Sequence, residues 1–309
     1  MKALLFSGQG SQYIGMLKDV CEKYPNAMEM IKKADEILGY SISDIMFNGP
    51  IEKLKETRYT QPSVFLHSVI CFDLIKDKLN YQAVAGHSVG EYSALYAAGV
   101  INFEDALKLV AFRGDLMFTA GEKIPGTMFA VINLENEKVI EVCNDLTNGD
   151  KVVVAANFNS PGQVVVSGSR DYLRENITAF KDAGARIVKE LVVSGAFHSS
   201  LMNPAKLELE KQINKLDFSK ANCNVYTNVT ALSVTDPLEI KNLLIQQLTS
   251  PVLWSQSLEN MQKNYINDFV EIGPSKVLQG LVKRTLKDVN ISGIDKVEDL
   301  NNLLKFVNK

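Results

Sequence analysis

The sequence predicts an α/β protein with two parts, a large body around a sheet with helices on both faces and a small inserted sheet. Three observations support this. Short apolar runs alternate with segments of helical periodicity along most of the 309 residues. The segment Gly86–Gly90 fits the strand-to-helix pattern G-x-S-x-G, directly after the apolar run 82–85. Between about residues 123 and 193 the expected order is β-α-β-β-α-β, the ferredoxin-like arrangement.

The first part of the chain supplies strands and helices on both sides of the G-x-S-x-G segment. A short buried strand at its start runs into a glycine-rich turn, and Gly99 is a candidate helix C-cap. The expected elements are a strand at 2–6, a turn at 7–12, helices at 26–38 and 62–79, the strand and elbow at 82–90, and helices at 91–98 and 103–119.

The pattern changes near Gly126, where strands become more frequent. Because this run of elements begins and ends inside the chain, we expect residues 123–193 to be an inserted subdomain and 1–122 with 194–309 to form the large domain. The expected elements are strands at 127–132, 152–154, 163–166 and 186–192, helices at 135–146 and 171–183, and a turn at 159–162.

Composition is typical of a globular protein with a large core, with 46% hydrophobic and 22% charged residues. A net charge of −3 excludes a strong nucleic-acid footprint. No stretch approaches the roughly 18 apolar residues of a membrane span, and the apolar run 3–6 is too short for a signal peptide. The four cysteines are widely spaced among apolar neighbours without a C-x-x-C pair, which predicts reduced core thiols. We therefore expect a cytoplasmic protein that binds neither membrane nor nucleic acid.

Ser88 is the candidate nucleophile, because the G-x-S-x-G turn leaves its serine exposed at the tip. The helix that follows would direct its N-terminal N–H groups at an anion formed beside the serine. A serine hydroxyl needs a base within hydrogen-bond reach. His198 follows a predicted strand and a glycine turn and is the favoured base, whereas His67 lies in an apolar helical run and the side chain of His87 should point away from the tip.

Six motifs occur in order along the chain and carry a family resemblance. They are Phe6-Ser7-Gly8-Gln9-Gly10-Ser11-Gln12, Gly86-His87-Ser88-Val89-Gly90-Glu91-Tyr92, Arg113-Gly114-x-x-Met117, Asn159-Ser160-Pro161-Gly162-Gln163, Ala196-Phe197-His198-Ser199 and Gly273-Pro274. A lone G-x-S-x-G also occurs in esterases, lipases and thioesterases, but the set of six resembles the malonyl-CoA–acyl carrier protein transacylases over essentially the whole chain. The resemblance implies an α/β-hydrolase-like large domain with a parallel sheet core and a ferredoxin-like insertion.

The resemblance also implies the catalytic roles. Ser88 would accept the malonyl group as an ester while His198 exchanges protons with the two thiols. The oxyanion hole would consist of the main-chain N–H groups of Val89 and Gln9. A main-chain carbonyl near Gln247, rather than an aspartate, would orient His198, since no acid in the expected order stands out.

Substrate selectivity is assigned by the same resemblance. Arg113, on an expected helix among apolar neighbours, would clamp the free carboxylate of malonyl, because a planar guanidinium matches a carboxylate fork. Phe197 would leave little room for an α-methyl group. Met117, Gln61 and Asn159 would line or orient the pocket. Ser7 departs from the family, which has proline there, so the loop of Gln9 is expected to be less rigid.

The implied partners are malonyl-CoA and an acyl carrier protein, with no bound cofactor, since coenzyme A enters only as a substrate carrier. Five basic residues are candidates for docking the carrier or binding coenzyme A phosphates: Arg186, Lys189, Lys276, Lys283 and Arg284. The motifs fit both fatty-acid synthesis and free-standing acyltransferases that serve polyketide synthases in trans. An acyl-thioester hydrolase on the same scaffold is the alternative function, and a non-catalytic carrier-binding scaffold is a third reading that the intact Ser88 and His198 disfavour.

Overall fold

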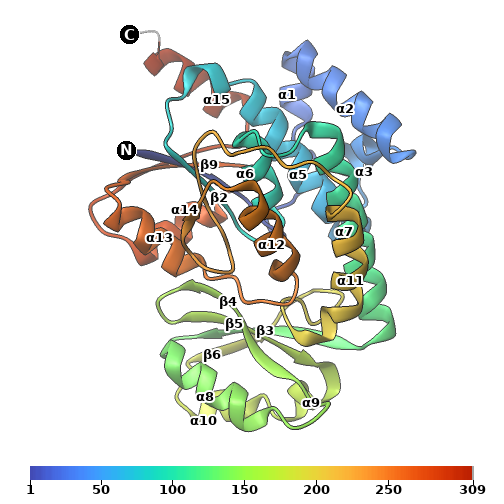
Figure 1. Cartoon of the computed structure of the whole chain (residues 1–309), viewed down its shortest axis with the longest axis vertical. Coiled ribbons are helices and arrows are strands. Elements are labelled where there is room, and N and C mark those ends of the chain that lie inside the picture. Colours follow the sequence, from blue (N-terminus) through green and yellow to red (C-terminus); the bar gives the residue numbers. More distant parts are fainter. Residues whose placement is uncertain (308–309) are drawn as a thin grey trace.

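Residues 1–307, which the computed structural model describes, form a large body and a smaller antiparallel sheet below it (Figure 1). The large body surrounds a six-stranded sheet with the order β10-β9-β1-β2-β7-β8, parallel except for β8, which pairs antiparallel with β7. Its strands are β1 (Lys2–Phe6), β2 (Ala83–Gly86), β7 (Asn224–Tyr226), β8 (Ser233–Val234), β9 (Asp268–Ile272) and β10 (Asn290–Ile294). The predicted α/β fold class is confirmed.

Helices cover both faces of this sheet because the strands are apolar on both sides. In β1, Leu4 and Phe6 enter the main core with α5, α6 and α7, while Ala3 and Leu5 face a second core formed with α13 and α14. The helices of the large body are α1 (Lys18–Lys23), α2 (Pro25–Leu38), α3 (Ile42–Asn48), α4 (Ile51–Lys55), α5 (Thr57–Asp73), α6 (Gly90–Ala97), α7 (Phe103–Lys123), α11 (Asn203–Ile213), α12 (Pro237–Gln247), α13 (Trp254–Lys263), α14 (Val277–Thr285) and α15 (Val297–Val307), with 3-10 turns at Lys76–Lys78 and Ser200–Met202.

The small sheet has the strand order β4-β5-β3-β6, which is the ferredoxin-like order for its chain sequence β-α-β-β-α-β. All of its elements lie within the expected insertion 123–193, whose boundaries stay a prediction. They are β3 (Gly126–Ile132), α8 (Asn136–Leu146), β4 (Val153–Ser160), β5 (Gln163–Ser169), α9 (Arg170–Glu175), α10 (Thr178–Asp182) and β6 (Ile187–Glu190).

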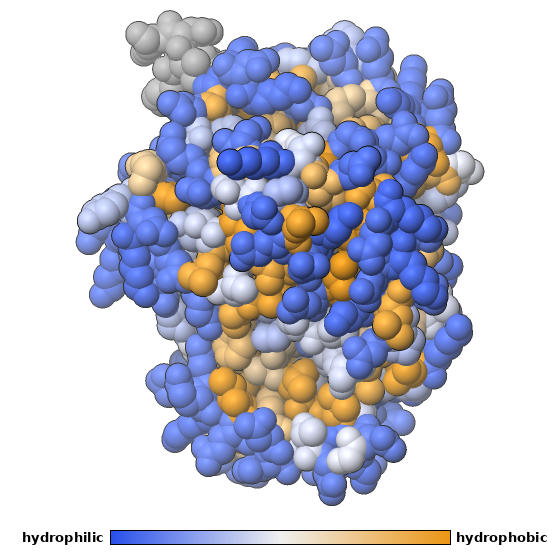
Figure 2. Space-filling model, viewed as in Figure 1, coloured by the Kyte–Doolittle hydropathy of each residue, from blue (hydrophilic) through white to orange (hydrophobic). Residues whose placement is uncertain are grey.

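The two faces of the small sheet pack against different partners. Phe129 and Val131 of β3 point into a core shared with α8, α9 and α10. Met128 of β3 and Val165 of β5 belong instead to the main core of the large body. Apolar side chains gather on the surface where the large body meets this sheet (Figure 2). The period-2 alternation of the strands therefore directs one face of the insertion toward the large body.

Several expected boundaries were wrong, and three of them have a clear physical reason. The helix expected at 62–79 begins at Thr57 and ends at Asp73, with Pro62 inside it, because burial of nearly the whole helix outweighs the lost hydrogen bond. The strand expected to end at residue 154 continues to Ser160, so Asn159 lies in β4 and not in the turn. The helix expected at 171–183 is divided, since α9 ends at Glu175 and the side chain of the next residue, Asn176, donates to the carbonyl of Tyr172.

None of the helices within residues 1–307 combines the length and the apolar content needed to cross a bilayer. The four cysteines are free thiols, as predicted, and Cys21, Cys71 and Cys143 are buried.

The main chain is tightly packed at the elbow between β2 and α6. A Cβ atom on Gly86 would overlap the main-chain carbonyl of Gly90, and one on Gly90 would overlap the carbonyl oxygen of Phe6 in β1. Gly280 in α14 is the opposite case, since a Cβ there would meet no atom within 4 Å. Both flanking glycines of the elbow are therefore required by close packing rather than by a positive φ.

We expect Gly90→Ala to lower the free energy of unfolding by about 3 kcal/mol, because the strand and helix must separate to admit the methyl group. Gly280→Ala is the matched control and should raise it by up to about 1 kcal/mol through helix propensity. Urea unfolding followed by circular dichroism measures both. Equal stability of Gly90→Ala and the wild type would contradict the packing argument.

Candidate active site

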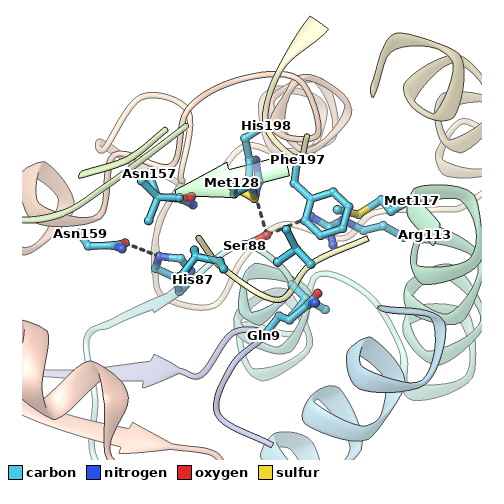
Figure 3. Close-up of a pocket in the computed structure, with 14 residues that line it drawn as sticks. Gln9, His87, Ser88, Arg113, Met117, Met128, Asn157, Asn159, Phe197 and His198 are labelled. Carbon is cyan, nitrogen blue, oxygen red and sulfur yellow. Dashed lines mark hydrogen bonds between the residues drawn. The ribbon is translucent and has the colours of Figure 1, made fainter. Parts of the chain in front are cut away.

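Ser88 stands at the tip of the elbow in a left-handed backbone conformation, with φ of 53°. This conformation is unfavourable for a residue with a side chain and is characteristic of functional sites. The Ser88 Oγ lies 2.9 Å from the Nε2 atom of His198, which is 3% exposed (Figure 3). The structure thus brings together the two residues predicted to form the catalytic pair, although they are 110 positions apart.

Two main-chain carbonyls fix the ring of His198. Its Nδ1 atom lies 3.0 Å from the carbonyl oxygen of Gln247 and 3.1 Å from that of Ser250. A carbonyl only accepts, so Nδ1 carries the proton and the lone pair of Nε2 faces Ser88. Among the hydrogen bonds of the described residues, none joins this ring to a carboxylate. The geometry is that of a Ser–His pair oriented by carbonyls, the arrangement expected from the sequence.

His198 is held in its neutral form. Burial lowers the pKa of His198 to about 3, and the nearby positive charge of Arg113 acts in the same direction. A neutral imidazole with its Nε2 lone pair on a serine hydroxyl can accept the proton of that hydroxyl.

Arg113 brings a positive charge directly to the nucleophile. The side chain extends from α7 and is 1% exposed. Its Nη1 donates to the Gln61 side-chain oxygen (2.6 Å), and its Nη2 donates to the Gln247 side-chain oxygen (3.0 Å) and to Ser88 Oγ (3.1 Å). Its Nε is buried without a partner. Burial lowers the Arg113 pKa from its usual value, yet no carboxylate within residues 1–307 forms an ion pair with it.

A buried cation without a direct ion-pair partner is costly, and the charge of Glu91 offsets only part of the effect of burial on the Arg113 pKa, so this arrangement is suited to receive an anion. Amide oxygens hold the guanidinium in place without neutralising it. A ligand carboxylate that entered beside Ser88 would supply the missing charge and could form the bidentate contact that a guanidinium favours.

The cavity at Ser88 has a volume of about 150 Å³ and lies between the elbow and the small sheet (Figure 3). The large body contributes catalytic and apolar side chains, and the small sheet contributes Met128, Asn157, Asn159 and Val165. The other lining residues are Gln9, His87, Ser88, Val89, Arg113, Met117, Leu191, Val193, Phe197 and His198. The space is sufficient for a short acyl group, and the ring of Phe197 forms part of its wall.

Gln9 and Val89 both line this cavity, as the oxyanion-hole prediction requires. Within the described chain, no main-chain hydrogen bond is donated by the N–H of either residue, and both lie outside strands and helices. The side chain of Gln9 is turned aside to Thr57 (3.2 Å). Gly8 lets this turn pass close to the carbonyl of His87, where a Cβ would not fit. The oxyanion hole itself stays a prediction.

The remaining predicted residues take two kinds of position. Met117, Asn159 and Phe197 line the cavity. Gln61 and Gln247 lie behind it and support Arg113, and the Gln61 amide nitrogen also contacts the Met117 sulfur at 3.1 Å. The structure therefore brings together all of the predicted site residues, two of them as supports of Arg113 rather than as pocket lining.

The other two histidines serve different purposes. His87 lines the cavity, but its ring points away from Ser88, and its Nε2 donates to the Asn159 side-chain oxygen at 2.8 Å (Figure 3). His67 is fully buried and lies 3.1 Å from a carboxylate oxygen of Asp295, which joins α5 to the chain after β10. Neither ring reaches the nucleophile.

Sequence reasoning did not find two polar residues at the elbow. Asn228 follows β7, and its side-chain oxygen accepts from the N–H of Ser88 at 2.7 Å. Glu91, in the first turn of α6, is 1% exposed, and burial raises its pKa to about 7. In the sequence, Glu91 could have been noticed as a charged residue directly before the apolar run of α6. Asn228 gave a weaker indication, its position just after a strand.

The five basic residues proposed for docking are exposed and lie outside the cavity. Lys189 belongs to β6 and Arg186 precedes it, whereas Lys283 and Arg284 belong to α14. The guanidinium of Arg284 donates to the Gln163 side chain of β5 at 2.6 Å, which connects α14 to the small sheet.

Known proteins resemble this chain over nearly its whole length, both in sequence and in structure. The sequence model of the acyl transferase domain family matches residues 3–302. A protein of Haemophilus influenzae named malonyl CoA-acyl carrier protein transacylase is 39% identical over 308 residues, which cover 99% of this chain and 98% of that protein. The crystal structure of an acyl carrier protein S-malonyltransferase from Vibrio cholerae superposes with a TM-score of 0.93 at 40% identity, covering 98% and 99% of the two chains.

A further similar structure is a malonyl-transacylase in complex with the acyl-carrier protein of a type II polyketide synthase. It has a TM-score of 0.94 and 35% identity, and the similarity covers 99% of each chain.

The protonation state of His198 can be tested with a serine-directed fluorophosphonate. Because the His198 pKa lies far below the ordinary value of 6.5, the base stays available on acidification, and we expect the labelling rate of Ser88 to show no inflection near pH 6.5. Intact-mass spectrometry across about pH 5 to 8 measures the rate, with Ser88→Ala as the blank. Glu91→Gln removes the buried carboxyl group beside Ser88 whose pKa is raised to about 7. An inflection near pH 6.5 that persists in that variant would contradict the assignment.

Proposed function

Because the chain belongs to the malonyl-CoA–acyl carrier protein transacylases, we propose that it transfers malonyl from coenzyme A to the phosphopantetheine thiol of a carrier protein through an ester on Ser88. The observation that carries the proposal is the buried guanidinium of Arg113, 3.1 Å from Ser88 Oγ and without a carboxylate partner among the described residues. A carboxylate-bearing acyl group satisfies this charge, whereas a simple ester or an unsubstituted acyl group does not.

In the first half-reaction His198 Nε2 takes the hydroxyl proton as Ser88 Oγ attacks the thioester carbonyl. The negative charge that develops on the carbonyl oxygen is stabilised by the N–H groups of Gln9 and Val89. The carbon–sulfur bond then breaks, His198 returns its proton to the coenzyme A thiolate, and malonyl-Ser88 remains. The 2.9 Å distance between Ser88 Oγ and His198 Nε2 supports this proton transfer.

In the second half-reaction the phosphopantetheine thiol replaces coenzyme A. His198 takes the thiol proton, the sulfur attacks the ester carbonyl, and Ser88 Oγ leaves with the proton from His198. Reversal is possible because both half-reactions exchange a thioester for an oxygen ester of the same acyl group. The same pair of residues therefore serves both directions without a separate acid.

Phe197 and Arg113 together select the acyl group in this proposal. Arg113 binds the free carboxylate, and the ring of Phe197, 5% exposed at the cavity wall, limits the space beside the α-carbon. One additional methyl group in such a pocket is disfavoured by about 1–3 kcal/mol. Malonyl is thus preferred over acetyl by charge and over methylmalonyl by volume.

The carrier would dock on the exposed basic residues of β6 and α14, since carrier proteins of this class present acidic helices. The relatives include a transacylase bound to a polyketide carrier as well as proteins named only for carrier malonylation, so either kind of carrier fits the proposal. The proposal includes a cytoplasmic location, which the four free thiols support.

Covalent capture tests the function directly. We expect incubation with malonyl-CoA alone to add one malonyl group to Ser88, and addition of a phosphopantetheinylated carrier to remove it as malonyl-carrier, because the reaction passes through the ester. Peptide mass spectrometry locates the adduct, and Ser88→Ala and His198→Ala are the controls. Release of malonate that is faster than transfer to carrier would favour the hydrolase instead.

The role of Arg113 can be tested by Arg113→Ala. We expect kcat/KM for malonyl-CoA to fall by at least about 100-fold, the scale of a lost hydrogen-bonded charge contact of roughly 3 kcal/mol, and the preference for malonyl over acetyl to fall with it. Steady-state kinetics with both donors measures this. Arg170→Ala, which removes an exposed arginine of α9, is the control. Unchanged selectivity in Arg113→Ala would refute the clamp.

A further inference from the structure

The strained main chain of Ser88 is held by side chains on both sides. Its N–H donates to the Asn228 side-chain oxygen at 2.7 Å, and its carbonyl oxygen accepts from the Gln247 side-chain nitrogen at 3.0 Å. The Asn228 amide nitrogen also donates to the carbonyl of Gly86 at 2.7 Å, across the turn. Both peptide groups of the nucleophile are therefore fixed by residues outside the elbow.

One carboxylate oxygen holds both of these supports. Oε2 of Glu91 accepts from the Gln247 side-chain nitrogen at 2.7 Å and from the main-chain N–H of Asn228 at 3.2 Å. Glu91 lies three residues after Ser88, in the first turn of α6, and is 1% exposed. It is not among the residues that line the cavity.

Gln247 extends the effect of Glu91 to the rest of the site. Its side-chain oxygen accepts from Nη2 of Arg113 at 3.0 Å, and its main-chain carbonyl accepts from Nδ1 of His198 at 3.0 Å. Gln247 thus contacts the nucleophile and the cation through its side chain and the base through its main-chain carbonyl. With its amide nitrogen held by Glu91, the amide of Gln247 is oriented with its oxygen toward Arg113.

The cost of burying Glu91 argues against a purely structural role. Within residues 1–307 Glu91 forms no direct ion pair. Burial raises its pKa, and the charge of Arg113 opposes this only in part, so an apolar residue of similar volume would be less costly there. Gln247 and Asn228, the two residues that donate to Glu91, each form a further hydrogen bond with the main chain of Ser88. The carboxylate is therefore placed where it orders the reacting groups rather than where it stabilises the core.

We propose that Glu91 is a positioning residue, whose single oxygen fixes Gln247 and Asn228 and through them Ser88 and Arg113. The inference rests on the proposed transfer for its kinetic readout only. Hydrogen-bond acceptance carries the effect, not negative charge, since both partners are neutral N–H donors. An amide oxygen in the same place is sufficient, whereas a carboxylate withdrawn by one methylene is not.

Two substitutions separate acceptance from charge. Glu91→Gln retains an oxygen at the position of Oε2 and loses the charge, so we expect it to keep most of kcat. Glu91→Asp retains the charge and withdraws the oxygen, so we expect kcat to fall by about 100-fold, the cost of a misplacement near 1 Å, with a reduced preference for malonyl over acetyl as Arg113 loses its support. Steady-state kinetics with both donors gives kcat, KM and selectivity.

Asp35→Ala is the matched control for the loss of a structural carboxylate. In α2, Asp35 accepts from the main-chain N–H of Ser43 at 3.0 Å and from its hydroxyl, far along the chain from the site residues. We expect this variant to lose thermal stability without a change in kcat or selectivity. Thermal unfolding of every variant identifies effects that come from the fold alone.

The fluorophosphonate labelling rate of Ser88 provides a readout that does not depend on the acyl donor. Slow labelling in Glu91→Asp together with wild-type labelling in Glu91→Gln supports the positioning role of Glu91 even if malonyl-CoA is not the donor. A failure of the proposed function can therefore be distinguished from a failure of this inference. The proposal is overturned if Glu91→Asp retains activity while Glu91→Gln loses it, or if both are as active as the wild type. If Glu91→Asp does not fold, a folded Glu91→Gln variant that loses most of kcat is sufficient to overturn the proposal.

Discussion

The close approach of β1, β2 and α6 at the elbow is the constraint on which the site depends. Gly86 and Gly90 have no room for a Cβ, and the turn between them leaves Ser88 with a positive φ. A conformation of this kind persists only when the surroundings over-determine it. Here they do so through Asn228 and Gln247, which hold the two peptide groups of Ser88. The exposed hydroxyl at the cavity floor is the result.

The electrostatics of the site follow from the burial of Arg113 without a direct ion-pair partner. Arg113 is held by the amide oxygens of Gln61 and Gln247 and keeps its charge available, whereas a carboxylate partner would have neutralised it. The same charge and the same burial lower the pKa of His198, so the base is neutral when the nucleophile needs it. A transacylase for a carboxylate-bearing acyl group requires both conditions in one cavity, and a general esterase requires only the second.

Much of this could be predicted because it depends on local sequence. The elbow, the ferredoxin-like order of the insertion and the pairing of Ser88 with His198 were read from glycine spacing, apolar periodicity and strand ends, and the resemblance added Arg113. Boundaries were less predictable. Pro62 indicated a helix start but lies inside α5, because burial along the whole helix outweighs one lost hydrogen bond. Asn159 indicated a turn but lies in β4, where pairing with β5 extends the strand.

By itself the sequence determined the α/β class, the nucleophile and the family, since these depend on residue order and short motifs. Only the tertiary structure decided how the parts support one another. Gln61 and Gln247, expected near the pocket, lie behind Arg113, and Glu91 holds Gln247 and Asn228 across 156 and 137 positions of the chain. The packing of α6, α7 and α12 around the sheet brings the donors and acceptors of these hydrogen bonds together. Because the bonded residues are far apart in the chain, the bonds leave no periodicity or spacing in the sequence.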